Sequence, residues 1–68
     1  MMIQELPEIL TASHISMYLA ISRGKVYELL KQLPSSGGIP NFAVGTSRRV
    51  AKTDFIAWIE HKKNTKEA

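Results

Sequence analysis

Two helical segments stand almost end to end near the start of this sequence. Residues 12–19 carry a stripe of small and apolar side chains at helical spacing, formed by Ala12, Ile15, Ser16 and Leu19. A second apolar face begins in residues 23–32 and consists of Val26, Leu29, Leu30 and Leu33. The connection between the two is only two or three residues long, and the small side chains of the first stripe allow close approach. The sequence therefore predicts two helices that meet through a tight turn.

Capping residues mark where both helices begin. Thr11 precedes the first helix, and its hydroxyl can accept a hydrogen bond from an unpaired backbone N–H. Glu or Gln three residues later would complete a capping box, but His14 occupies that place, so we expect only half of the box. Ser22 is the corresponding cap of the second helix. Pro34 ends that helix, because proline lacks the N–H that a helix interior needs.

The rest of the chain predicts a loop, a β-hairpin and a third helix. Residues 34–40 hold two Pro and two Gly, which is typical of a loop. Strands over residues 41–44 and 48–51 flank a turn that contains glycine, so we expect a hairpin with a three- to four-residue loop. The third helix covers residues 53–63, and its expected core residues are Phe55, Trp58 and Ile59.

Length and composition bound what the chain can do. We expect one α+β domain over residues 10–63, between a lead-in over residues 1–9 and a tail over residues 64–68. A chain of 68 residues has no room for an enclosed substrate cavity beside a core, which argues against an enzyme. The sequence has no cysteine and no apolar run near the about 20 residues that span a bilayer. Its first residues lack the basic start and long apolar stretch of a signal peptide, so we expect none there. We therefore expect a cytoplasmic protein without membrane contact.

The positive charge is concentrated in the middle of the chain. Residues 1–21 carry two acids and no Lys or Arg, and residues 53–68 carry three of each sign. Residues 22–52 carry six Lys and Arg side chains and one acid, Glu28, so this segment has a net charge of +5. The whole chain has a net charge of +3. A clustered basic face is typical of a protein that binds polyanions. The alternative is a solvated surface that only keeps the protein soluble.

The order of the elements points to a nucleic acid. Two helices joined by so short a turn have the spacing of a helix-turn-helix, whose second helix meets base edges in the major groove. A hairpin that follows would form a wing on an adjacent groove or on the phosphate backbone. The predicted fold is a small α+β winged helix-turn-helix, in the order helix, helix, β-hairpin (wing), helix.

Residues 10–60 resemble excisionase-type, MerR-like winged helix-turn-helix DNA-binding domains. The resemblance rests on three stretches: LTASHISMYLAISRGKVYELL at residues 10–30, IPNFAVGTSRRV at residues 39–50 and KTDFIAWI at residues 52–59. The chain departs from the family pattern in three places. Ala20 stands where the family often has Gly or Asn, Glu28 stands where a basic or polar residue is common, and the loop at residues 34–40 is longer.

The resemblance implies a DNA-binding module and its partners. Small members often act as recombination directionality factors of phages and integrative elements, which bend DNA near attachment sites and help an integrase excise the element. Other members regulate transcription. The implied partners are double-stranded DNA and, for an excisionase, an integrase. A DNA partner also implies association with the bacterial nucleoid. The expected state is a monomer or a weak cooperative assembly on DNA.

The second helix supplies most of the candidate DNA-binding residues, namely Ser22, Arg23, Gly24, Lys25, Tyr27, Glu28 and Lys31. Cations in the first turn oppose the helix dipole, so helix stability does not explain Arg23 and Lys25. Glu28 repels phosphate but can accept a hydrogen bond from a cytosine amino group. Gly24 either lets the helix backbone approach DNA closely or is merely tolerated there. Tyr27 either reaches a phosphate or packs at the edge of the core.

The wing supplies the other candidates, Thr46, Ser47, Arg48 and Arg49. Adjacent residues of a strand point to opposite faces, so the two arginines cannot serve the same contact. We favour Arg48, which lies nearer the tip, and leave Arg49 as either a second contact or a residue that packs on the sheet or pairs with an acid. Thr46 and Ser47 can donate to phosphate through their hydroxyl and backbone groups.

No residue pattern indicates a catalytic site, a cofactor or a metal. His14 and His61 lie far apart and lack a ligand motif, and Asp54 and Glu60 do not share a helix face. The sequence predicts a sequence-specific duplex DNA-binding protein, with an excisionase as the favoured role. The alternatives are a small transcriptional regulator of the same fold and a protein–protein adaptor that does not bind DNA.

Overall fold

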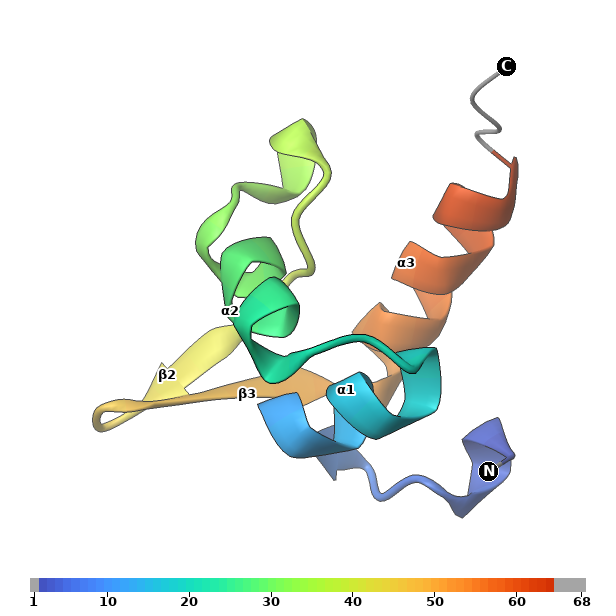
Figure 1. The fold of residues 1–68 in the computed structure, drawn as a ribbon, viewed down its shortest axis with the longest axis horizontal. Helices are drawn as coiled ribbons and strands as arrows, with labels where there is room; N and C mark the ends of the chain where they lie inside the picture. The colour runs from blue at the N-terminus through green and yellow to red at the C-terminus, as the bar shows by residue number, and fades with distance from the viewer. Residues whose placement is uncertain (1, 65–68) are drawn as a thin grey trace.

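The computed structural model describes residues 2–64 (Figure 1). The helices are α1 (Ala12–Leu19), α2 (Arg23–Lys31) and α3 (Lys52–Asn64), and the strands are β1 (Ile9–Leu10), β2 (Phe42–Val44) and β3 (Ser47–Ala51). Two 3₁₀ turns, η1 (Ile3–Glu5) and η2 (Pro34–Ser36), complete this part of the chain. The predicted α+β class and the order helix, helix, hairpin, helix are confirmed, with helix limits within one residue of expectation.

The turn between α1 and α2 closes through Ser16. The N–H groups of Ala20 and Ile21 both donate to the Ser16 carbonyl, the second at 3.1 Å, and the Ser16 hydroxyl donates to the Ile21 carbonyl at 2.6 Å. Ala20 has φ 58° and ψ 43°, which is the left-handed conformation, as the departure from the family pattern suggested. These bonds turn the chain from α1 into α2 within three residues.

The capping box of α1 is complete, so the prediction of half a box was wrong. Thr11 Oγ1 accepts from the His14 backbone N–H at 3.3 Å, and His14 Nδ1 accepts from the Thr11 N–H at 3.0 Å. The imidazole Nδ1 takes the acceptor role of the Glu carboxylate because an unprotonated ring nitrogen has a lone pair. Ser22 caps α2 as predicted, with its hydroxyl accepting from the Lys25 N–H at 3.2 Å.

The sheet has the antiparallel order β1–β3–β2. The sequence did not predict β1, whose two residues are too few to show alternation. Val44 pairs with Ser47, so the hairpin loop has only two residues, Gly45 and Thr46, and not the expected three or four. Gly45 has φ 63°, the positive value that the first residue of a type II′ turn requires. The short loop gives the wing a fixed tip.

The long loop after α2 folds back onto the helix. Leu33 is 69% exposed, so its predicted place in the core was wrong: its extended backbone before Pro34 turns it outward. Ile39 is fully buried instead, and its N–H donates to the Leu29 carbonyl at 3.1 Å. The Trp58 indole donates to the Gly37 carbonyl at 3.1 Å, which ties the loop to α3. The start of β2 is thereby held beside α2.

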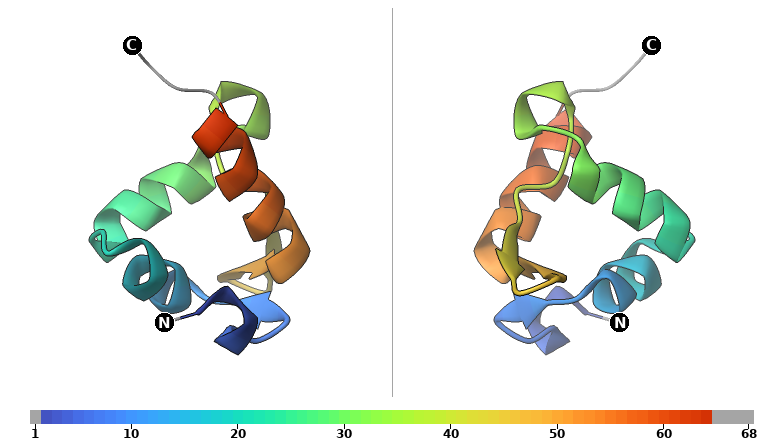
Figure 2. Two further views of the ribbon diagram at one scale, coloured as in Figure 1. Left: turned by 90° about the vertical axis from the view of Figure 1, so that its right-hand side faces the viewer. Right: turned by 90° about the vertical axis from the view of Figure 1, so that its left-hand side faces the viewer.

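The core is small and contiguous. Its fully buried members are Leu10, Ile15, Val26, Ile39, Val50 and Phe55. Phe55 is buried as predicted, and it packs edge-on against Tyr18 and stacks with the half-buried Trp58. Figure 2 shows α2 and α3 on opposite sides of the molecule, converging near η2, with α1 and the sheet at the other end.

The segment before α1 also contacts the domain. Leu6 is buried in the core, and its carbonyl accepts from Lys52 Nζ at 3.1 Å. The proposed division of the chain at residues 10 and 63 stays a prediction. Asn64 is the last residue of α3, and the remainder of the predicted tail, residues 65–68, lies outside the described residues.

We expect Ala20→Gly to stabilise the protein. A residue with a Cβ in the left-handed region loses about 1 kcal/mol, part of which is offset by the greater backbone entropy of glycine in the unfolded chain. The net gain in the free energy of unfolding is about 0.5 kcal/mol, measured by urea denaturation of both proteins. A loss of stability would contradict the left-handed turn.

Gly38→Ala should have the opposite effect. A Cβ at Gly38 would lie 2.1 Å from the Gln32 carbonyl oxygen and 2.6 Å from its carbon, and both atoms belong to backbone that cannot give way cheaply. Such overpacking costs about 2–3 kcal/mol, which is a large part of the stability of so small a domain. The check is the same denaturation experiment, and an unchanged midpoint would show that the loop does not press against α2.

Candidate nucleic-acid interface

A groove lies between α2, the N-terminal end of α1 and the tip of the hairpin. Its volume is about 470 Å³. We name it the helix–wing groove, and its lining residues are Thr11, Ala12, Ser13, Arg23, Tyr27, Thr46, Ser47, Arg48 and Arg49. The fold thus brings all four predicted wing residues to one place with two of the predicted residues of α2.

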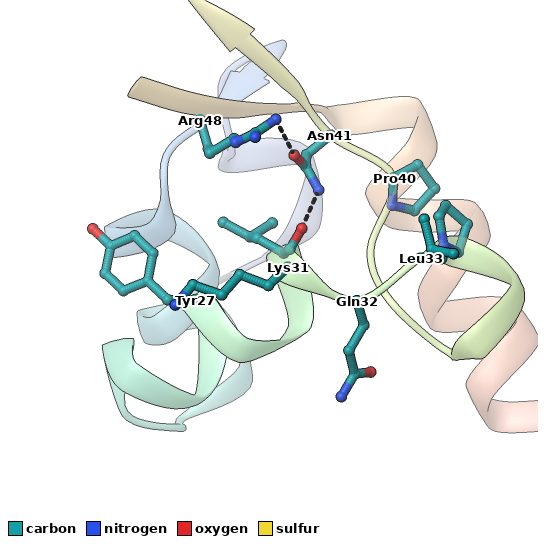
Figure 3. A pocket seen from close by; sticks show the side chains of 9 residues that line it. Tyr27, Lys31, Gln32, Leu33, Pro40, Asn41 and Arg48 are labelled. Atoms are coloured by element: carbon teal, nitrogen blue, oxygen red, sulfur yellow. Dashed lines mark hydrogen bonds between the residues drawn. The ribbon is translucent and has the colours of Figure 1, made fainter. Parts of the chain in front are cut away.

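A second groove of about 570 Å³ continues along α2 toward its C-terminal end (Figure 3). Its lining is mostly apolar and includes Leu30, Leu33, Pro34 and Pro40, together with Lys31 and Asn41. Tyr27 and Arg48 line both grooves, so the two meet at this pair. One trough therefore follows α2 on its hairpin side from Arg23 to Lys31.

The helical period explains which predicted residues enter the trough. Arg23, Tyr27 and Lys31 are four residues apart, so they share the face of α2 that looks toward the hairpin. Gly24 and Glu28 are exposed on the outermost line of the helix, opposite the buried Val26 and Leu30.

Two further predicted residues lie outside the trough. Lys25 lies on the flank of α2 away from the hairpin, two positions past Arg23. Ser22 is exposed at the start of the helix, where its hydroxyl is used as the cap. Neither residue lines the helix–wing groove or the second groove, although both stay on the exposed side of the first turn.

The three arginines of the helix–wing groove, Arg23, Arg48 and Arg49, form no ion pair with an acidic side chain among residues 2–64. The ion pair found in that range joins Lys63 to Glu60 on α3, at 3.8 Å. Lys52, which the charge count placed with the basic segment, is used to bind the Leu6 carbonyl and is half-buried. Intramolecular ion pairing therefore does not account for the arginines of the helix–wing groove.

The two wing arginines occupy different surroundings. Arg48 is exposed, and its Nη1 donates to Asn41 Oδ1 at 3.3 Å. Arg49 is half-buried, lies across from Phe42 on the other face of the sheet, and folds its Nη1 back to the Arg48 carbonyl at 2.9 Å. The two side chains start from opposite faces of β3, as expected for adjacent residues of a strand. Both arginines nevertheless border the helix–wing groove.

Tyr27 and Gly24 are both accessible from outside. Tyr27 is 49% exposed. A Cβ on Gly24 would meet only the Ser22 hydroxyl, at 3.9 Å. Packing within the protein therefore does not require glycine at position 24.

Sequence reasoning missed two parts of this surface. The sequence marks Thr11 and Ser13 only as the start of a helix. Both line the groove, because α1 packs with its N-terminal end toward the hairpin. The sequence marks Asn41 only as a strand residue, yet it contacts both α2 and Arg48. No sequence signal marks these three residues as part of the surface, since their places depend on tertiary packing.

Residues 2–64 hold neither a metal-binding cluster nor a membrane-spanning helix. No three His, Cys, Asp or Glu side chains in this range lie close enough to hold a metal ion. None of the helices in this range has the length and apolar character to cross a membrane.

Fold and surface together define a winged helix-turn-helix with a basic trough between its second helix and its wing. Comparison with known protein families matches residues 9–63 to the helix-turn-helix domain family, and the chain belongs to that family. The helix-turn-helix is a DNA-binding motif, so the chain is a DNA-binding helix-turn-helix protein. Searches of curated proteins and of solved structures found no match.

Gly24→Ala separates folding from binding at this surface. The space around Gly24 is open and alanine favours the helix, so we expect the free energy of unfolding to rise by up to about 1 kcal/mol. If the helix backbone approaches DNA at this point, the added methyl weakens duplex binding at the same time. Denaturation and a fluorescence-anisotropy titration measure the two effects. Higher stability with unchanged affinity would mean that glycine has no role in binding.

Proposed function

We propose that this protein binds duplex DNA sequence-specifically, with α2 in the major groove and the β2–β3 hairpin on the adjacent backbone or minor groove. The observation that carries the proposal is the helix–wing groove, which holds Arg23, Arg48 and Arg49 and no acidic lining residue. A helix in one groove of DNA and a wing in the next must enclose the sugar–phosphate strand that separates them. The trough is where that strand would lie.

The groups around the trough suit a phosphate strand. Guanidinium groups bind phosphate oxygens through paired N–H donors, and hydroxyls such as those of Ser13, Thr46 and Ser47 donate single hydrogen bonds. The N-terminal end of α1 also borders the groove and adds the positive end of a helix dipole. Phosphate contacts of this kind fix the position of the protein on DNA without reading the sequence.

Sequence readout would come from the outermost line of α2. Gly24 and Glu28 lie there, with Lys25 beside them on the far flank. A Glu carboxylate can accept from the cytosine amino group, and a Lys ammonium can donate to guanine acceptors. Gly24 would let the helix backbone come close to the base edges.

We favour an excisionase of a phage or integrative element as the biological role, on the strength of the resemblance described above for residues 10–60. A monomer this small offers few base contacts, so tandem sites or an integrase would supply further specificity. A transcriptional regulator would use the same residues and is the second candidate. Deleting the gene from a strain that carries the element distinguishes them: an excisionase is required for excision, whereas a regulator changes transcript levels instead.

The salt dependence of binding tests the proposed surface. Each neutralised phosphate contributes about −0.9 to the slope of log K against log salt concentration, and about four to six basic residues give a slope of roughly −3 to −5. Arg23→Ala/Arg48→Ala should make the slope shallower by about 2 and weaken binding at every salt concentration, because both side chains line the helix–wing groove. Anisotropy with a labelled duplex between low and physiological salt measures both quantities.

Lys62→Ala/Lys63→Ala is the matched control. This variant also lowers the formal net charge of +3 by two. Its two lysines are exposed in the last turn of α3, at the end of that helix that lies far from the hairpin (Figure 1). The slope should stay near that of the wild type. Equal effects of the two double variants would show that net charge alone attracts DNA. No effect of Arg23→Ala/Arg48→Ala would remove the helix–wing groove from the proposal.

A further inference from the structure

Asn41 joins three parts of the molecule through one side chain. Its Nδ2 donates to the Leu30 carbonyl at 2.9 Å and to the Ile39 carbonyl at 2.8 Å. Its Oδ1 accepts from Arg48 Nη1 at 3.3 Å (Figure 3). The chemistry of the neighbours fixes this orientation of the amide, because two carbonyls require the NH₂ group and a guanidinium requires the oxygen.

The bond to Leu30 follows from the sequence. In a helix the Leu30 carbonyl would accept from the N–H of residue 34, but residue 34 is Pro34, which has none. The Asn41 amide takes the place of that missing donor. The half-buried Asn41 is therefore anchored to the C-terminal end of α2 at a point that needs a hydrogen bond.

We propose that Asn41 is a positioning residue for DNA binding, which holds the Arg48 guanidinium over the trough at a fixed place relative to α2. This proposal rests on the proposed function. Arg48 lies at the junction of the two grooves, and one bond to Asn41 uses only one of the five N–H donors of its guanidinium. The remaining donors stay available for phosphate, and the side chain loses less rotamer freedom when DNA arrives.

A double-mutant cycle tests whether Asn41 acts through Arg48. In the wild-type background, Asn41→Ala should lower the affinity for a labelled duplex by about 3- to 10-fold, whereas in the Arg48→Ala background it should lower it by less than about 2-fold. Asn64→Ala is the matched control, because Asn64 is the only other asparagine and lies exposed at the end of α3. It should leave the affinity unchanged in both backgrounds.

The outcomes separate this proposal from the proposed function. An equal loss of affinity in both backgrounds would mean that Asn41 supports the fold alone, and would overturn its positioning role while DNA binding stands. A wild-type protein that fails to bind any duplex would overturn the proposed function itself.

If Asn41→Ala does not fold, an NMR measurement on proteins that keep Asn41 tests the same proposal. The side-chain amide of Asn41 gives its own pair of resonances in a ¹⁵N–¹H spectrum. Arg48→Ala, which changes an exposed side chain, should shift these resonances, and adding duplex to the wild type should shift them again. Resonances that do not move on Arg48→Ala would overturn the positioning role.

Discussion

The segment that follows α2 determines whether this small protein has a binding surface at all. Pro34 deprives α2 of a backbone donor, and the chain then folds back so that the Ile39 N–H and the Asn41 amide bind the Leu29 and Leu30 carbonyls. Burial of Ile39 holds the fold-back in place. The hairpin starts directly after it and so must run beside α2. Without this constraint the wing has no fixed distance from the helix, and the helix–wing groove does not exist.

The charges of that groove show a balance between folding and binding. Like charges close together destabilise a compact state, and a domain of this size has little stability to spare. Even so, Arg23, Arg48 and Arg49 meet around one groove without an acid, while the Lys63–Glu60 ion pair lies on α3. A polyanion that binds at the groove would supply the missing counter-charge. The proposed function therefore explains a feature that folding alone does not.

Local signals predicted the local structure, and tertiary contacts decided the rest. The Ser22 cap, the limits of α1 and the burial of Phe55 follow from residue type and spacing alone. The exchange of Leu33 for Ile39 in the core does not, because the helical pattern runs on past the end of the helix. Strand β1 is too short to show a pattern and forms only by pairing with β3. The sequence left the placement of the wing relative to α2 open, because the loop at residues 34–40 is long. The fold brings the wing candidates beside α2, and Thr11 and Ser13 join them through packing that no spacing rule describes.

The most direct test of the account is an NMR titration of ¹⁵N-labelled protein with a short duplex at low salt. If the helix–wing groove receives the phosphate strand, the largest changes in amide shifts fall on residues 11–13, on α2 and on the hairpin tip at residues 45–48. The exposed positions of α3 should stay nearly unchanged and serve as an internal reference. Largest changes on α3 or around Ile9, with the hairpin tip unaffected, would contradict the account.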